Sequence, residues 1–165
     1  MTERQKYELI KVIAGVEIRK YHPCVMADVV VESDYEKAGN LGFRPLVTYI
    51  SQNNIAMTAP VIQEENQTKS WIVSFVMPEN MKLTDLPTPK NTKVTLREVP
   101  THHAAALIFR GITTSEKVKE KEKELRTILN ATNIKIAGPL KIARFDPPWK
   151  PGFMRHNEVV LPIIY

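Results

Sequence analysis

The segment from Phe145 to Glu158 holds the side chains whose types and spacing best suit ligand chemistry. Its three prolines restrict the backbone, yet it carries large apolar groups and cations together: Trp149, Lys150, Phe153, Met154, Arg155 and His156. Aromatic faces stack on flat rings and cations pair with carboxylates, so the segment predicts a site for a flat, acidic amphiphile. The alternative is that Trp149 and Phe153 fold back onto a sheet as a lid over the core.

The histidines and the single cysteine do not form a recognisable metal site. His22, His102, His103 and His156 lack the spacing of a helical metal pair, and one cysteine cannot form a cysteine cluster. We interpret the histidines as polar turn residues; the alternative is that one of the four is an axial ligand to an iron porphyrin. No metal ligand is assigned, and Cys24 is predicted to be a small buried hydrophobe rather than a thiolate.

The signatures of common enzyme sites are missing from the sequence. It has no glycine-rich phosphate loop, nucleophile elbow or calcium loop, and its acidic residues show no local pairing suited to acid–base work. We therefore predict no catalytic residue and a protein that is not an enzyme.

The composition is that of one globular domain of 165 residues, 43% hydrophobic and 25% charged. The net charge is +5, but the cations are scattered among acids and form no stripe with aromatic residues, so we predict no nucleic-acid partner. No stretch approaches the roughly 18 apolar residues of a membrane helix, and the N-terminus lacks the apolar core of a secretory signal. With one cysteine fitting a reducing compartment, we predict a cytoplasmic protein.

The chain reads as two related halves, at about 7–78 and 93–164, within a single domain over 1–165. Val16–Tyr21 aligns with Val94–Val99, and Ala27–Val31 aligns with Ala105–Phe109. Each half has the order β-α-β-β, which predicts an α+β fold around a curved or barrel-like sheet. Strands are expected at 7–11, 16–21, 25–32, 55–63, 70–78, 93–99, 103–110, 140–146 and 157–164, with the second helix at 114–130.

The first helix is the least regular predicted element. Gly39, Gly42 and Pro45 are poor helix-interior residues, so the helix is expected to begin near Phe43 or Arg44 and to end at about Gln52. Capping boxes are predicted for the segments before the two helices, at Ser33 with Glu36 and at Thr113 with Glu116. The apolar residues of the first helix cover more than one stripe, which favours one side facing a cavity. Met57 and Met154 suit either pocket lining or gap filling in a core.

Several strings of the sequence resemble the SOUL haem-binding protein family. They are Tyr7–Ile10, Val16–Tyr21, Tyr49-Ile50, Met57–Val61, Val76–Pro78, and Phe145–Pro148 followed by Lys150-Pro151 and Arg155–Val159. The resemblance covers nearly the whole chain. It implies a distorted antiparallel β-barrel flanked by two helices, built from two pseudo-symmetric β-α-β-β repeats, and a relation to gyrase-inhibitor-like effector-binding domains.

The resemblance also implies a shallow tetrapyrrole pocket between the first helix and the loop before the last strand. Lys150 matches the loop lysine of the family, and Arg44 lies in the region that corresponds to its helix. Phe43, Leu46, Val47 and Ile50 would form the apolar floor, with Met57, Trp149, Phe153, Met154 and Arg155 completing the site.

We therefore predict a non-enzymatic carrier or buffer that binds haem or another porphyrin reversibly, with haem modification or breakdown left open. One alternative is an effector-binding module for other amphiphilic small molecules. Another is a protein-interaction domain that uses the patch from Trp149 to Met154.

Overall fold

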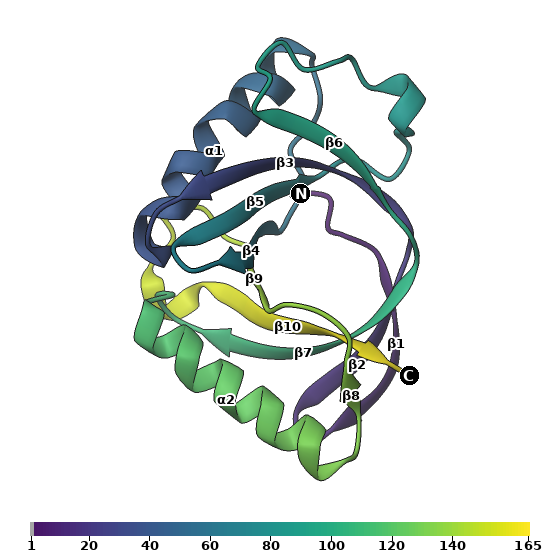
Figure 1. Cartoon of the computed structure of the whole chain (residues 1–165), viewed down its shortest axis with the longest axis vertical. Coiled ribbons are helices and arrows are strands. Elements are labelled where there is room, and N and C mark those ends of the chain that lie inside the picture. The colour runs from purple at the N-terminus through teal and green to yellow at the C-terminus, as the bar shows by residue number, and fades with distance from the viewer. Residues whose placement is uncertain (1) are drawn as a thin grey trace.

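The computed structural model describes residues 2–165, which form one large antiparallel sheet and two α-helices (Figure 1). The elements follow in the order β1 (Tyr7–Ile13), β2 (Val16–Tyr21), β3 (Cys24–Glu32), α1 (Tyr35–Gln52), β4 (Val61–Gln67), β5 (Ser70–Val76), β6 (Val94–Val99), β7 (His102–Arg110), α2 (Ser115–Ala131), β8 (Lys135–Ile136), β9 (Lys141–Arg144) and β10 (His156–Ile164). Two short 3₁₀ turns, η1 (Leu83–Asp85) and η2 (Gly152–Met154), lie in the loops.

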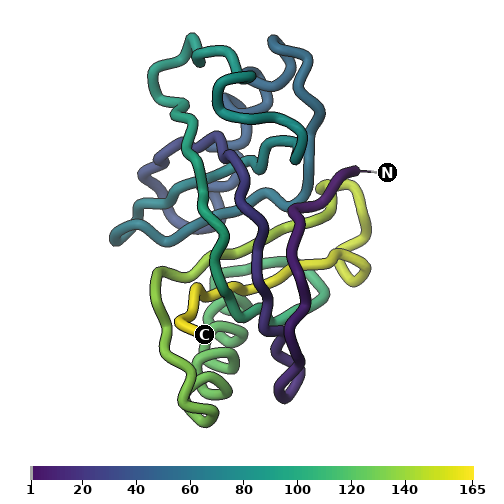
Figure 2. Tube along the Cα trace, turned by 90° about the vertical axis from the view of Figure 1, so that its right-hand side faces the viewer, coloured from purple at the N-terminus to yellow at the C-terminus, as the bar shows by residue number. Residues whose placement is uncertain are grey.

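The sheet is curled but open. Its strands pair in the order β1-β2-β7-β10-β9-β4-β5-β3-β6, with β8 added beside β10. The order from β2 to β6 is symmetric about the β9–β4 pair. Counted outward from that pair, β10, β7 and β2 on one side correspond to β5, β3 and β6 on the other. Figures 1 and 2 show the strands curving around a central space. The predicted α+β fold, a barrel-like antiparallel sheet with two helices, is confirmed.

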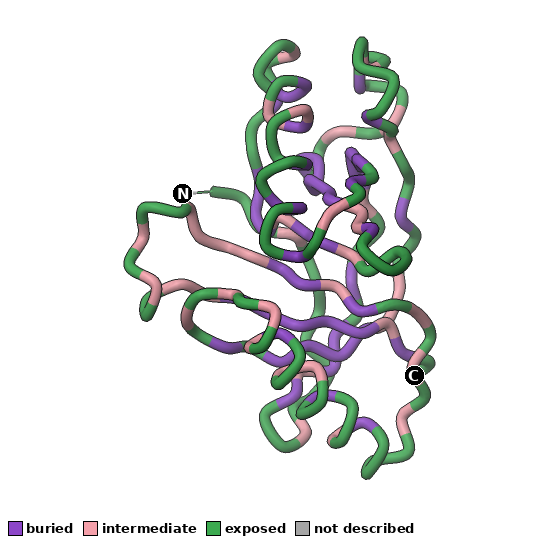
Figure 3. The backbone as a smooth tube through the Cα atoms, turned by 60° about the vertical axis from the view of Figure 1, so that its left-hand side comes forward, coloured by how far each residue is buried: buried purple, intermediate pink, exposed green. Residues whose placement is uncertain are grey.

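The two helices pack on the outer face of the curl and form two hydrophobic cores. One core joins α2 to β2, β7, β9 and β10, and the other joins α1 to β3, β5 and β6. Side chains alternate across a strand, so Val159 and Leu161 of β10 point into the first core, whereas Glu158 and Val160 lie on the opposite, inner face. Figure 3 shows burial concentrated along the central strands, while the outward turns of the helices are exposed.

Helix α1 begins at Tyr35, so the predicted start near Phe43 or Arg44 is wrong. Asp34 caps the helix by accepting a hydrogen bond of 3.0 Å from the Lys37 backbone N–H. Gly42 faces the sheet at close range, because a Cβ there would lie 2.5 Å from the Val73 Cβ. Sequence propensity counted this glycine against the helix, but its missing side chain is what allows helix and sheet to approach.

Pro45 lies inside α1, where it removes one backbone hydrogen bond at a cost of about 3 kcal/mol. The same helix buries large side chains at Leu46, Tyr49 and Ile50, and each such burial stabilises the fold by about 1.5–3 kcal/mol. Tertiary packing therefore outweighs the local penalty, and the helix continues through the proline.

Smaller differences concern the strands and caps. β4 begins at Val61 rather than at residue 55, because 55–60 forms a loop with a cis peptide between Ala59 and Pro60. β8 was not predicted, whereas α2 lies within one residue of its predicted bounds. The N-cap of α2 is Thr114, not Thr113, and the Thr114 side chain accepts a hydrogen bond from the Lys117 backbone N–H at 3.1 Å.

Neither helix in the described chain combines the length and apolarity needed to cross a membrane.

Candidate ligand-binding site

A cavity of about 630 Å³ lies between the first half of α1 and the loop that joins β9 to β10. The segment 57–61 and the loop between β7 and α2 complete its walls. Its lining is largely apolar, with polar and charged groups around it: Thr2, Tyr35, Glu36, Gly39, Asn40, Phe43, Met57, Thr58, Ala59, Val61, Gly111, Thr113, Arg144, Phe145, Asp146, Pro147, Pro148, Trp149, Arg155 and Asn157. A mainly apolar concavity with a few placed polar groups is the usual form of a small-molecule site.

Asp146 fixes the β9–β10 loop. Its carboxylate accepts hydrogen bonds from Lys150 Nζ at 2.9 Å and from the His156 backbone N–H at 2.6 Å. Burial alone would raise the pKa of Asp146, but these hydrogen bonds outweigh it and hold the pKa below its usual value. Arg155 Nε donates to the Lys150 carbonyl at 2.9 Å. The loop is therefore held by its own polar groups, which leaves its aromatic side chains outside the core.

The segment 57–61 is anchored on two sides. The Thr58 hydroxyl donates to the Val76 carbonyl, and Ala59 pairs with the N-terminal segment through hydrogen bonds of 2.8 Å with Glu3 and Gln5. This anchoring places Met57 at the cavity, where the residue is 39% exposed.

Arg144, at the end of β9, lines the cavity beside α1 and was missed from the sequence. Its Nη1 donates a long hydrogen bond of 3.4 Å to the Tyr35 hydroxyl. A Cβ at residue 39 would collide with the Arg144 guanidinium, so Gly39 provides the space in which this cation lies. In the sequence Gly39 counted only against a helix, and only the fold shows that it makes room for the Arg144 side chain.

The structure brings four of the eleven predicted haem contacts to the cavity: Phe43, Met57, Trp149 and Arg155. The other seven do not line it. Leu46 and Ile50 lie in the core beneath α1, and Val47 packs against that core. Arg44 is exposed on α1 and Lys150 is paired with Asp146, while Phe153 and Met154 lie on η2 outside the cavity.

The alternative in which the loop aromatics cover the core is wrong. The Trp149 side chain is 84% exposed and that of Phe153 is 79% exposed. Of the two, Trp149 lines the cavity and Phe153 does not.

None of the four histidines, all of which lie within the described chain, lines this cavity. His102 and His156 face the inner side of the curled sheet instead, and His156 Nε2 lies 2.9 Å from a Glu158 oxygen. Burial raises the pKa of the Cys24 thiol, which favours the neutral form over a thiolate ligand. Over residues 2–165, no three metal-ligating side chains gather into a cluster.

Comparison with known proteins extends these observations. The family model described as SOUL heme-binding protein matches residues 2–162. No curated protein matches the sequence.

Among solved structures, the chain is similar to the EcmrR C-terminal domain, with a TM-score of 0.72 and 13% identity over 96% of this chain and 98% of that domain. It is also similar to a hydrolase from Listeria innocua, with a TM-score of 0.63 and 10% identity over 94% of each chain. SAV2435 bound to tetraphenylphosphonium gives a TM-score of 0.51 and 6% identity over 96% of this chain and 94% of that one. Identities this low establish a shared fold alone, but the family match covers nearly the whole sequence. The chain therefore belongs to the SOUL haem-binding protein family.

Proposed function

We propose that this protein binds haem or another tetrapyrrole reversibly in the cavity between α1 and the β9–β10 loop, and acts as a carrier or buffer rather than as an enzyme. One observation carries the proposal: in a member of this family, an apolar cavity of about 630 Å³ has two arginines, Arg144 and Arg155, in its wall. These residue types fit a porphyrin, which combines a broad apolar ring with two carboxylates.

Apolar contact would supply most of the affinity. Burying roughly 300 Å² of porphyrin surface contributes about 7 kcal/mol at about 25 cal/mol per Å². Phe43, Met57 and Trp149 offer aromatic and thioether surface for this contact. The exposure of Trp149 supports such a role, since a bound ring would remove a large apolar side chain from water.

Arg144 and Arg155 are the cations we assign to the ligand carboxylates. Guanidinium groups bind carboxylates through paired hydrogen bonds. Lys150 remains a candidate from the family resemblance, but its ammonium is already paired with Asp146 at 2.9 Å. Arg144, which makes only a long hydrogen bond to Tyr35, is therefore expected to contribute more than Lys150, and Arg155 to contribute less than Arg144 because it also donates to the Lys150 and Pro148 carbonyls.

Iron coordination is not expected to decide the affinity, because the histidines lie outside the cavity wall. Hemin and metal-free protoporphyrin should then bind with similar strength. A strong preference for hemin would instead indicate an iron ligand, and Met57 would be the first residue to test.

The decisive experiment is an absorbance titration with hemin. We expect a saturable Soret change, weakened about tenfold or more by Arg144→Gln, because a hydrogen bond to a charged group contributes about 1.5–3 kcal/mol. Arg44→Gln makes the same change at an exposed arginine outside the cavity and is the matched control, while Lys150→Ala tests the lysine that the family resemblance implies. A greater loss with Lys150→Ala would assign the carboxylates to the lysine. A Soret response no stronger than that of an unrelated basic protein would refute the proposal.

A second candidate is an effector-binding module for other amphiphilic small molecules. It is favoured by the fold shared with SAV2435, whose structure contains tetraphenylphosphonium. Competition between hemin and tetraphenylphosphonium for the protein would separate the two functions. Arg144 and Arg155 disfavour a cation beside them because like charges repel, but Glu36 and Asp146 also line the cavity, so the competition measurement decides between the two functions.

A third candidate is a protein-interaction domain that uses the exposed patch from Trp149 to Met154. Capture of a partner that is lost with Trp149→Ala, while hemin binding persists, would favour it.

We assign no catalytic residue. Loss of the porphyrin chromophore on adding a reductant to the haem complex would reveal haem breakdown.

We further propose a cytoplasmic location and a single domain of two duplicated halves. One cysteine among 165 residues fits a reducing compartment. The symmetric strand order about β9 and β4 supports the duplication.

A further inference from the structure

The loop between β9 and β10 carries several large apolar side chains that face water. Trp149 lies just before η2, while Phe153 and Met154 lie on η2, and all three are exposed. Ile112, from the loop between β7 and α2, is 61% exposed and lies against η2, since a Cβ at Gly152 would be 2.8 Å from its Cγ1. We call these four apolar side chains the tip patch. Figure 2 shows the yellow-green β9–β10 loop projecting at one side of the molecule.

The cavity proposed for the tetrapyrrole uses little of the tip patch. Trp149 lines the cavity, but Ile112, Phe153 and Met154 do not. Single exposed apolar residues are ordinary on protein surfaces, whereas a group of them on adjoining loops marks a surface that binds a partner. Three of the four side chains are therefore left without a role in the core or in the cavity wall.

The loop is held in this outward arrangement by its own polar groups. Asp146 accepts a hydrogen bond from Lys150 Nζ at 2.9 Å, and Arg155 donates to the carbonyls of Lys150 and Pro148. The prolines restrict the backbone further. A loop that is already ordered loses little conformational freedom when its exposed side chains bind a partner.

Positive charge accompanies the tip patch. Arg110 is exposed, and its Nη1 donates to the Met154 carbonyl at 3.0 Å, so this guanidinium lies beside η2. Arg155 contacts loop carbonyls in the same way. Within residues 2–165, neither guanidinium has a carboxylate oxygen within 4.0 Å, and Asp146 in the loop is already paired with Lys150. The patch therefore combines apolar surface with positive charge that no carboxylate neutralises.

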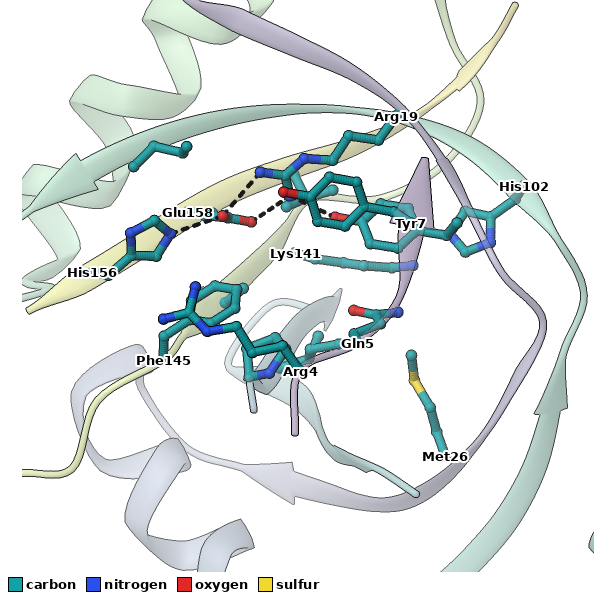
Figure 4. Close-up of a pocket in the computed structure, with 16 residues that line it drawn as sticks. Arg4, Gln5, Tyr7, Arg19, Met26, His102, Lys141, Phe145, His156 and Glu158 are labelled. Atoms are coloured by element: carbon teal, nitrogen blue, oxygen red, sulfur yellow. Dashed lines mark hydrogen bonds and ion pairs between the residues drawn. The ribbon is translucent and has the colours of Figure 1, made fainter. Parts of the chain in front are cut away.

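The arginine on the inner face of the sheet is different. Arg19 is buried and donates to Glu158 Oε1 at 2.6 Å, while His156 lies 2.9 Å from the second oxygen of the same carboxylate (Figure 4). A buried charge needs such a partner within the protein. The charges of Arg110 and Arg155 have no such partner, so an anion from outside the protein can supply it.

Size and composition favour a lipid surface as the partner. A specific protein interface buries about 800 Å² and about 20–30 residues on each side, whereas the tip patch has four side chains. Aromatic side chains with neighbouring cations are the usual contents of a membrane-surface contact. The rings enter the boundary between headgroups and acyl chains, and the cations are attracted to anionic lipids.

We propose that the tip patch docks this protein reversibly on the surface of an anionic lipid bilayer. Trp149, Phe153, Met154 and Ile112 enter the headgroup boundary, and Arg110 with Arg155 faces the lipid phosphates. Docking does not require a bound tetrapyrrole. Because Trp149 belongs to both the patch and the cavity wall, docking brings the cavity to the membrane surface, where a lipophilic ring partitions.

Vesicle binding by the ligand-free protein tests the proposal. Sedimentation with vesicles of phosphatidylcholine mixed with phosphatidylglycerol should show saturable binding, and vesicles of phosphatidylcholine alone should bind more weakly. In a Trp71→Phe protein the remaining tryptophan is Trp149, and its emission should shift to the blue when the mixed vesicles are added, because the indole leaves water.

Matched variants separate the patch from the rest of the surface. Ile112→Ser should weaken binding to the mixed vesicles about fivefold and Phe153→Ser about tenfold, because each removes apolar area from the contact. Ile164→Ser is the control, since Ile164 is also 61% exposed but lies at the opposite end of β10. Arg110→Gln should weaken binding about fivefold, whereas Arg44→Gln, at an exposed arginine of α1, should leave it unchanged.

Three outcomes would overturn the proposal. The first is no saturable binding to the mixed vesicles, which would leave the patch to a protein partner. The second is binding that neither Ile112→Ser nor Phe153→Ser weakens, which would mean adsorption through the net charge of +5 alone. The third is an unchanged Trp149 emission in the bound state. Hemin affinity should be unaffected by Ile112→Ser, so failure of docking and failure of tetrapyrrole binding are distinguishable.

Discussion

The two glycines inside α1 give the sharpest test of how this helix is placed. Gly39→Ala and Gly42→Ala are the same chemical change in the same helix, and each gains about 1 kcal/mol of helix propensity. Their surroundings differ. A Cβ at residue 42 would lie 2.5 Å from the Cβ of Val73, which is fixed to the sheet backbone. A Cβ at residue 39 would meet only the end of the flexible Arg144 side chain.

Gly42→Ala must therefore push the helix away from β5, and overpacking of this kind costs about 1–3 kcal/mol. Gly39→Ala can be accommodated when Arg144 moves. Because the propensity gain cancels in the comparison, we expect Gly42→Ala to be less stable than Gly39→Ala by about 1–3 kcal/mol.

Urea denaturation followed by circular dichroism measures this difference, provided that the two variants have equal m-values. Hemin titration of the same proteins gives a second readout. Gly39→Ala should keep or gain stability but bind hemin more weakly, since it displaces Arg144 from its place in the cavity wall. A Gly42→Ala protein as stable as Gly39→Ala would refute the close approach of α1 to the sheet.

Three further predictions concern single side chains. Glu158→Gln removes the buried counter-charge of Arg19 and leaves it only the partly exposed Glu17, so the free energy of unfolding should fall by about 3 kcal/mol, the lower end of the range for a broken buried pair; an unchanged urea midpoint would contradict this. Because the folded-state pKa of Glu158 is lowered, its stabilisation is present above about pH 4.5 and is lost as the pH falls through the folded-state pKa, so the variant should show a weaker acid dependence in urea titrations at several pH values. Burial raises the pKa of Cys24, so an aromatic disulfide reagent at pH 8 should modify it more slowly than free cysteine, and equal rates would show that the thiol is open to water. In a Trp71→Phe protein, the remaining Trp149 should emit at the wavelength of a water-exposed indole and be quenched by hemin; a blue-shifted emission would mean that the loop folds over the core.

Part of the site could be found from sequence because its residues are unusual for their context. Trp149 stood out because a proline-rich loop rarely carries an indole, and its exposure at the cavity rim agrees with that interpretation. Met57 belonged to a string that resembles the family. Such local signals depend on residue type, which the sequence contains directly.

The first helix shows where local signals fail. Gly42 and Pro45 lower helix propensity, and sequence reasoning placed the start of the helix too late for that reason. The deciding energies were the burial of Leu46, Tyr49 and Ile50 and the close contact with Val73, which depend on elements elsewhere in the chain.

The sequence by itself determined the α+β class, the strand periodicity and the family, since these follow from the residue order within short segments. Only the tertiary structure decided which side chains meet. It placed Lys150 on Asp146 rather than in the cavity, and it brought Arg144 beside Gly39. It also joined Arg19 to Glu158 across 139 residues. Pairings over such distances arise when a curled sheet brings separate strands together, and no local pattern encodes them.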